Sequence, residues 1–157
     1  MKSGRIEVLI RPAERRDIAA IAALFADDAL GGHGDTADAS ARPRYEAAFK
    51  RIAASPNDML YVAELEGEVV GTFQTTLVTT MSGQGSSSLT IAAVQTRADL
   101  RSHGIGGQMM RFAIDEARVK GARLVQLMSN GKRADAHRFY ERLGFVKSHA
   151  GFKMKLR

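Results

Sequence analysis

The chain has 157 residues, of which 45% are hydrophobic and 25% are charged, the composition of an ordinary soluble globular protein. It contains no cysteine, which excludes disulfides, thiolate metal sites and a cysteine nucleophile. The formal net charge of +6 favours an anionic partner, although a basic surface without a specific ligand explains the same charge.

The length fits one domain over residues 1–157. No apolar run approaches the roughly 20 residues that cross a membrane. The opening sequence MKSGRIEVLI lacks the apolar core of a signal peptide. We therefore expect a cytoplasmic protein with no membrane partner.

The first part of the sequence predicts a strand and two helices. Residues 6–11 alternate as a strand does. Asp17 is a candidate N-cap for a helix that the glycines at 31–32 would end. Apolar residues at helical spacing predict a second helix over 45–52, which Ser55-Pro56 would end.

A hairpin and a further strand are expected next. Strands over 59–65 and 69–78 are joined by the glycine-containing turn EGE. The segment SGQGSSS at 82–88 is typical of a flexible loop. Residues 89–96 predict another strand.

The remaining sequence predicts helices over 104–120 and 133–143, with a strand over 123–129 between them. The last expected strands lie at 145–148 and 152–157. This order indicates a mixed α/β or α+β fold, in which a largely antiparallel sheet contains one parallel β-α-β crossover.

The turn RSHGIG, residues 101–106, is a candidate anion site. The first backbone N–H groups of the helix that follows have no internal acceptor, and the helix dipole favours a negative charge beside them. Gly104 and Gly106 allow a diphosphate to approach the main chain, and Arg101 adds a positive charge. The glycines alone would also fit an ordinary strand–helix turn.

Two familiar phosphate-binding motifs are excluded. A dinucleotide fingerprint that began at Gly104 would need glycine where Met109 stands, and the chain contains no P-loop string.

The segment AVQTRADLRSHGIGGQMM (93–110) resembles the acyl-CoA-binding motif of the GCN5-related N-acetyltransferase (GNAT) superfamily. Residues 127–145, with an A-x-x-x-Y helix that closes with LGF, resemble the second hallmark of the family, and 10–25 resemble its usual opening. The resemblance implies a GNAT-like acyl-CoA N-acyltransferase fold. Such a fold has a mostly antiparallel sheet, a parallel splayed strand pair and about four helices.

The resemblance implies that acetyl-CoA is the cosubstrate and that its pantetheine arm lies along the splayed strand, as in strand addition. For Val94 and Thr96 the alternative is an ordinary place in a strand. The resemblance to the family assigns twelve residues to cofactor binding: Val94, Gln95, Thr96, Arg101, Ser102, His103, Gly104, Ile105, Gly106, Gly107, Asn130 and Arg133.

By the same resemblance, Tyr140 is the catalytic residue. It would act as the general acid that protonates the leaving thiolate after an amine attacks the thioester through a tetrahedral intermediate. A main-chain N–H near Val94 would stabilise the oxyanion. The alternative for Tyr140 is a half-buried aromatic residue on an amphipathic helix.

The general base is not identified, because Ala92 stands where some relatives have an acidic residue. Asp27, Asp28, His33 and Asp35 lie in the region that forms the acceptor pocket in the family, but each also fits a solvated loop, and none is assigned a catalytic role. No histidine has a partner at metal-ligand spacing, so we expect no metal site.

The sequence therefore predicts an N-acetyltransferase that transfers the acetyl group of acetyl-CoA directly to a primary amine of a small molecule or protein. The alternative is a non-catalytic acyl-CoA-binding sensor or regulatory domain. A basic nucleic-acid binder is a third hypothesis, but no reading motif or run of stacking aromatic residues supports it, so no nucleic-acid partner is expected. The family suggests a homodimer.

Overall fold

The computed structural model describes residues 4–28, 34–129, 131 and 133–157. Its strands are β1 (Leu9–Pro12), β2 (Asp58–Leu65), β3 (Glu68–Thr79), β4 (Ser87–Thr96) and β5 (Leu124–Leu127). Its helices are α1 (Ile18–Ala26), α2 (Arg42–Ala54), α3 (Ser82–Gly85), α4 (Ile105–Val119) and α5 (Ala134–Arg142). Short 3-10 turns are η1 (Arg15–Asp17), η2 (Ala39–Ala41) and η3 (Ala98–Leu100).

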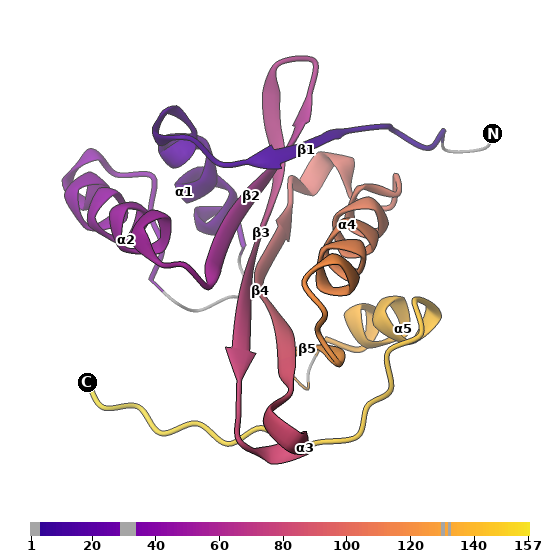
Figure 1. Ribbon diagram of the computed structural model, residues 1–157. Helices are drawn as coiled ribbons and strands as arrows, with labels where there is room; N and C mark the ends of the chain where they lie inside the picture. The colour runs from indigo at the N-terminus through magenta and orange to yellow at the C-terminus, as the bar shows by residue number, and fades with distance from the viewer. Residues whose placement is uncertain (1–3, 29–33, 130, 132) are drawn as a thin grey trace.

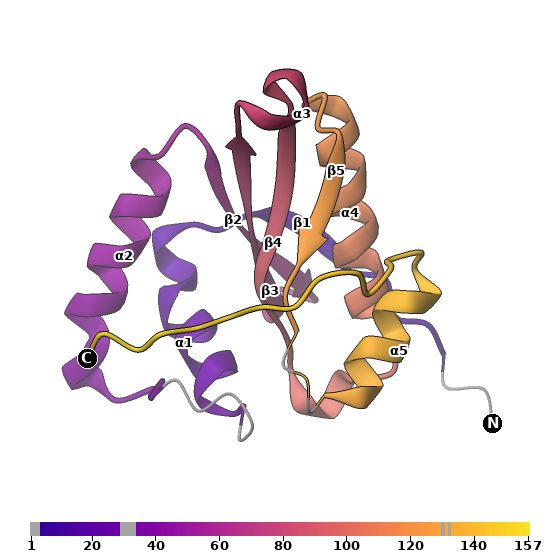
Figure 2. The same ribbon diagram turned by 90° about the horizontal axis from the view of Figure 1, so that it is seen from below.

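The five strands form one sheet in the order β1-β2-β3-β4-β5. All neighbouring pairs are antiparallel except β4 and β5, which are parallel and joined through α4. Helices α1 and α2 cover one face of the sheet, and α4 and α5 cover the other (Figures 1 and 2). The predicted mixed fold with a single parallel crossover is confirmed.

The first strand begins later than expected, at Leu9 rather than at residue 6. The chain before it is bonded to a side chain of α4 instead of to a strand. Gln108 Oε1 accepts from the Val8 N–H at 3.1 Å, and Gln108 Nε2 donates to the Ile6 carbonyl at 2.5 Å. An amide side chain thus replaces the backbone of a neighbouring strand.

Asp17 is not the side-chain cap that was expected. Its buried carboxylate turns back and accepts from the Glu14 N–H at 2.7 Å and from the Arg11 guanidinium at 2.7 Å. Burial alone would raise its pKa, but these two hydrogen bonds lower the pKa below the ordinary value. The helix that follows ends at Ala26, and the predicted stop at 31–32 lies outside the described residues.

The second helix and the hairpin are confirmed, with α2 beginning a few residues earlier than predicted. The hairpin turn consists of Glu66 and Gly67, both at positive φ (51° and 82°), as a two-residue turn between twisted strands requires. The serine-rich segment is not a flexible loop. Gly83 and Gln84 form a left-handed turn, and Ser87 and Ser88 already pair with β3.

In the last part of the chain, α4, β5 and α5 lie where they were predicted. Gly144, at φ 101°, ends α5, and the Phe145 N–H donates back to the Tyr140 carbonyl at 3.1 Å. The strands predicted at 145–148 and 152–157 are wrong. A strand needs a hydrogen-bonded neighbour, and this segment leaves α5 as extended, exposed chain that crosses below the sheet (Figure 2).

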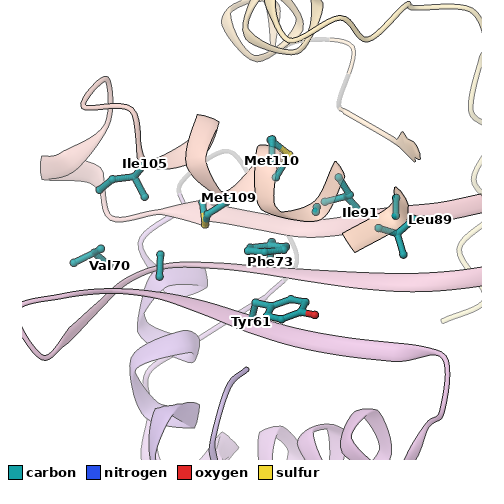
Figure 3. Close-up of a cluster of buried hydrophobic side chains, with 11 residues drawn as sticks. Tyr61, Val70, Phe73, Leu89, Ile91, Ile105, Met109 and Met110 are labelled. Carbon is teal, nitrogen blue, oxygen red and sulfur yellow. The ribbon is translucent and has the colours of Figure 1, made fainter. Parts of the chain in front are cut away.

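The core lies between the sheet and α4. Met109 and Met110 of α4 are fully buried against Phe73 of β3 and Leu89 of β4 (Figure 3). The rings of Tyr61 and Phe73 stack at 5.0 Å. Close packing of this kind fixes α4 on the sheet, and therefore fixes the position of its first turn. Among the described residues, no helix has both the length and the apolar character needed to cross a bilayer.

Candidate cofactor and acetyl-transfer site

Strands β4 and β5 separate halfway along β4. They pair only from Ser88 with Leu124 to Ile91 with Leu127. From Ala92 to Thr96, β4 continues to pair with β3 but, within the residues that the structure describes, pairs with no strand on the β5 side. We call this divergence of β4 from β5 the wedge.

A β-bulge in β4 lies at the point of separation. Gln74 pairs with Ala92 and Thr72 pairs with Gln95, so Ala93 and Val94 together face a single residue of β3. Ala93 is held at φ +53°, a region that costs an L-residue about 1–2 kcal/mol. A bulge bends its strand and turns its main-chain groups to new directions. It thus accounts for the divergence of β4 from β5.

The turn after β4 forms a concave main chain at the start of α4. Ser102 has φ +67°, and Gly104, the N-cap, has φ +85°. Left-handed residues in such a turn direct neighbouring N–H groups toward one point. The N–H groups of Ile105, Gly106 and Gly107 add to them, because the first turn of a helix has no internal acceptors for its donors. The site favours an anion such as a diphosphate.

The side chains around this turn divide into two groups. The exposed Arg101 folds back toward the end of β4, where its Nε donates to the Thr96 carbonyl at 3.4 Å. His103 faces the other way, with its Nδ1 at 3.4 Å from the Gly4 carbonyl and its own carbonyl accepting from the Ile6 N–H at 3.0 Å.

Among the described residues, three of the predicted cofactor residues are buried, Gln95, Ile105 and Gly107. The Ile105 side chain is 1% exposed and belongs to the core, so only its main chain faces the turn. Gln95 is 7% exposed. The structure thus brings the end of β4 and the turn 101–107 together, as the sequence predicted, while Asn130 lies outside the described residues.

Helix α5 packs on the first turn of α4. A Cβ at Gly106 would lie 3.3 Å from Phe139 Cζ, so glycine is what permits this approach. Phe139 and the half-buried Tyr140 are in ring contact at 5.2 Å, and Phe145 contacts Tyr140 at 5.9 Å. No local sequence pattern indicates the contact between Gly106 and Phe139, which holds the helix that carries Tyr140 beside the candidate anion site.

The Tyr140 hydroxyl is protonated at neutral pH. Burial raises its pKa above the ordinary value, against a smaller opposing effect of the nearby Arg133 guanidinium. A neutral phenol that keeps its proton is a donor, the state that a general acid requires.

Arg133 and Asp28 form an ion pair at 3.0 Å that joins the start of α5 to the end of α1. Both side chains are partly buried. Arg133 was predicted to bind the cofactor, and Asp28 was placed in the acceptor region without a catalytic role. A separation of 105 residues carries no signal of their contact. The pair therefore ties the beginning of α5 to the end of α1.

Of the other acidic candidates, Asp35 accepts the Tyr45 hydroxyl at 2.7 Å, which ties this loop to α2. Ala92 is exposed on β4 and offers no titratable group. His33 lies outside the described residues. No group of three histidine, aspartate or glutamate side chains within the described part of the chain is close enough to bind a metal ion.

A sequence model of the acetyltransferase (GNAT) family matches residues 18–145. A segment of 57 residues is 47% identical to an aminoalkylphosphonate N-acetyltransferase of Salmonella typhimurium, over 36% of this chain and 37% of that protein. The matched part thus spans little more than a third of the length of that relative.

Solved structures share the whole fold. A protein described as a transcriptional regulator from Bacillus halodurans C-125 is 39% identical, with a TM-score of 0.92 over 96% of this chain and 100% of that chain. AAC(6')-Iy, solved with a bisubstrate analogue that contains CoA, has a TM-score of 0.76 over 96% of this chain and 99% of that chain. Its 14% identity is evidence of a shared fold alone.

Proposed function

The chain belongs to the acetyltransferase (GNAT) family, and on that premise we propose that it transfers the acetyl group of acetyl-CoA to a primary amine. The observation that carries the proposal is the wedge between β4 and β5, which opens beside the anion-binding first turn of α4. A diphosphate bound at that turn and an extended arm laid along the free edge of β4 bring a thioester toward Tyr140. The solved relative that holds a CoA-containing analogue supports the same ligand.

The roles of the residues follow from their positions. The N–H groups of residues 104–107 bind the diphosphate, with the Arg101 guanidinium beside them. The main chain of Val94 and Thr96 hydrogen-bonds the extended arm as an added strand would. The bulge at Ala93 directs the Val94 N–H to the carbonyl oxygen, where it stabilises the developing negative charge.

Transfer then needs two proton movements. The amine nitrogen bonds to the acetyl carbon and gives a tetrahedral intermediate; this collapses as the bond from carbon to sulfur breaks, and Tyr140 donates its hydroxyl proton to the sulfur. The amine loses a proton in the same reaction. No side chain on the exposed part of β4 can accept it, because Ala92 and Ala93 occupy the open positions, so we assign this proton to water.

The acceptor binds beside the Asp28–Arg133 ion pair, where the ends of α1 and α5 meet. Asp28 offers a carboxylate to an ammonium group, and Arg133 offers a guanidinium to an acidic one. A small acceptor with both charges would engage both residues, and the segment shared with an aminoalkylphosphonate N-acetyltransferase supports that class. Thiol release should be measured across aminoalkylphosphonates, amino acids, polyamines, aminoglycosides and peptides.

The first testable prediction concerns Tyr140→Phe, which removes the acidic proton and keeps the ring. With the best acceptor of that panel, we expect the rate of thiol release to fall about 100-fold or more, while acetyl-CoA affinity is unchanged. Tyr61→Phe is the matched control, because Tyr61 is a buried residue of β2 whose ring contacts Phe73 and Phe112 in the core. Its rate should stay at the wild-type value.

The alternative function is a non-catalytic acyl-CoA sensor. It is favoured by one observation, that a solved structure 39% identical to this chain is described as a transcriptional regulator. A sensor would bind acetyl-CoA yet release no thiol with any amine, and Tyr140→Phe would leave its behaviour unchanged. That pair of results would replace the acetyltransferase proposal.

A further inference from the structure

Gln74 of β3 is a half-buried polar side chain beside the point where β4 leaves β5. Side chains alternate along a strand, so Gln74 points away from its neighbour Phe73, which is fully buried against α4 (Figure 3). Gln74 pairs with Ala92 of β4, the residue that precedes the bulge. Ala92 likewise points away from Ile91, which is buried in the same core. The two side chains therefore share the face of the sheet that α1 and α2 cover (Figure 1).

The Gln74 side chain is long enough to reach the point of acetyl transfer. Directly paired residues on neighbouring strands have Cβ atoms about 4.5–5.5 Å apart. Ala92 is exposed and carries only a methyl group, so the space over this position is open to the longer side chain on β3. The next residues along β4 form the bulge, where the Val94 N–H is assigned to the oxyanion.

Asp58, the first residue of β2, lies on the same face as Gln74. It pairs with Thr76, which is two residues from Gln74 along β3, and the Thr76 hydroxyl donates to its carboxylate at 2.5 Å. Hydrogen bonds from the side chains of Thr76, Ser55 and Gln74 outweigh the effect of burial and lower the pKa of Asp58 below its ordinary value. Asp58 is therefore a charged carboxylate at neutral pH.

This carboxylate decides which end of the Gln74 amide faces the wedge. An ionised carboxylate only accepts hydrogen bonds, so the group of Gln74 that faces Asp58 is the amide NH2. The strands β2 and β4 flank β3 on opposite sides, so the amide oxygen is directed away from Asp58 and toward Ala92. Within the part of the chain that the structure describes, no residue donates a hydrogen bond to this oxygen. A half-covered oxygen without a donor is ready to accept one from a ligand.

We propose that Gln74 positions the attacking amine and that Asp58 orients Gln74 for this task. The inference rests on the proposed acetyl transfer. The Gln74 oxygen accepts one N–H of the neutral primary amine, which turns the nitrogen lone pair toward the acetyl carbon at the bulge. The nitrogen–carbon bond then forms, and the proton that the nitrogen loses passes to water, because an amide is not basic enough to take it. Gln74 thus supplies from β3 a contact that Ala92 cannot supply from β4.

Gln74→Met tests the contact to the amine. Methionine is similar in length and shape but is at best a weak acceptor. We expect kcat for thiol release to fall about 10-fold, with unchanged affinity for acetyl-CoA and with stability in urea equal to or above that of the wild type.

Gln74→Glu is the conservative variant that separates this role from packing. Glutamate keeps an acceptor oxygen and can itself take the amine proton, so kcat should equal or exceed the wild-type value. It also places a second negative charge beside Asp58, so stability in urea should fall. A side chain that only packs would give the opposite order, with methionine tolerated and glutamate harmful to both properties.

Gln126→Met is the matched control on the same face. Gln126 of β5 donates to the Thr90 hydroxyl at 3.1 Å, in the stretch where β4 and β5 are still paired. Because its amide already has a partner and lies before the strands separate, its replacement should leave kcat at the wild-type value.

Asp58→Asn, made in two backgrounds, tests the orienting role. In the wild type it frees the Gln74 amide to turn either way, and kcat should fall about twofold or more, since only one of two amide orientations is productive. The two oxygens of a carboxylate are equivalent, so the same change in the Gln74→Glu background should leave kcat unaltered. Equal losses in both backgrounds would show that Asp58 acts only through the fold.

These outcomes separate the inference from the proposed function. A wild type that releases no thiol with any amine overturns both. A wild type that turns over, with Gln74→Met at the same rate or with Gln74→Glu as slow as Gln74→Met, overturns the role of Gln74 and leaves acetyl transfer standing.

Discussion

Ala93 is a non-glycine residue with a positive φ at the site, as Ser102 also is. The positive φ of Ala93 sits in the bulge that separates β4 from β5, and no motif in the sequence marks it. Backbone strain of this kind persists only where the surrounding structure imposes it. Here the pairing of β4 with β3 before and after the bulge, Ala92 with Gln74 and Gln95 with Thr72, holds Ala93 in this conformation.

Ala93→Gly should therefore stabilise the fold. Glycine removes about 1–2 kcal/mol of backbone strain at a positive φ. This exceeds the roughly 0.5–1 kcal/mol of stability that glycine loses because its unfolded chain has more conformational freedom. Urea unfolding measures the difference. Ala92→Gly is the neighbouring control, which has no positive φ to relieve and should lose stability. Equal losses for both variants would contradict a strained bulge.

Asp17 gives a stability prediction with a defined pH dependence. The Asp17 side chain is 5% exposed and forms an ion pair with Arg11. Arg11 also contacts Glu64 at 3.2 Å. Asp17→Asn leaves the Arg11 charge without its main partner and should cost about 3 kcal/mol at neutral pH. Asp115→Asn, at an exposed ion pair with Arg118, should cost nothing measurable.

The sign of the pH effect follows from the lowered pKa of Asp17 in the folded state. A carboxyl whose pKa falls on folding stabilises the protein at pH values above its unfolded pKa of about 3.9. The contribution is lost as pH falls through the lower, folded value. The gap between wild type and Asp17→Asn should stay constant from neutral pH to about pH 4 and shrink below it. A gap that widens in acid would contradict the assigned role.

At the scale of elements, the contact between α4 and α5 decides where Tyr140 lies. Gly106→Ala places a methyl group 3.3 Å from the Phe139 ring, which is too close for normal packing, and should push α5 away from the anion site. We expect thiol release to fall about 10-fold, a typical cost for a small displacement of a reacting group.

Gly106→Ala combined with Phe139→Leu is the matched control, because the smaller side chain makes room for the methyl group. The double variant should recover most of the lost rate. If it remains as slow as Gly106→Ala alone, the glycine acts by admitting a ligand to the main chain rather than by admitting α5.

The sequence predicts α4, α5 and the hairpin well because each has its own periodicity and its own end signals, such as Gly67 and Gly144. It does not predict the chain before β1, whose hydrogen bonds go to the distant Gln108. It also wrongly predicts strands at 145–148 and 152–157, because alternation shows which residues could share a face but does not supply the hydrogen-bonded neighbour that a strand needs. Long-range pairings such as Asp28 with Arg133 leave no trace in local pattern.

At the scale of the molecule, the same sheet forms part of the core and provides the main-chain edge of the candidate site. Where β4 and β5 pair, they belong to the core, and where they separate they leave a main-chain edge beside the first turn of α4. The net charge of +6 adds a general attraction for a polyanionic ligand. Affinity for that ligand should therefore fall as salt is added.

Calorimetric titration with acetyl-CoA tests whether the wedge and the turn at 101–107 together bind this cosubstrate. We expect one site per chain, an affinity that weakens with salt, and much weaker binding of acetyl-pantetheine, which lacks the diphosphate. Absence of binding, or equal affinity for acetyl-CoA and acetyl-pantetheine, would contradict this expectation.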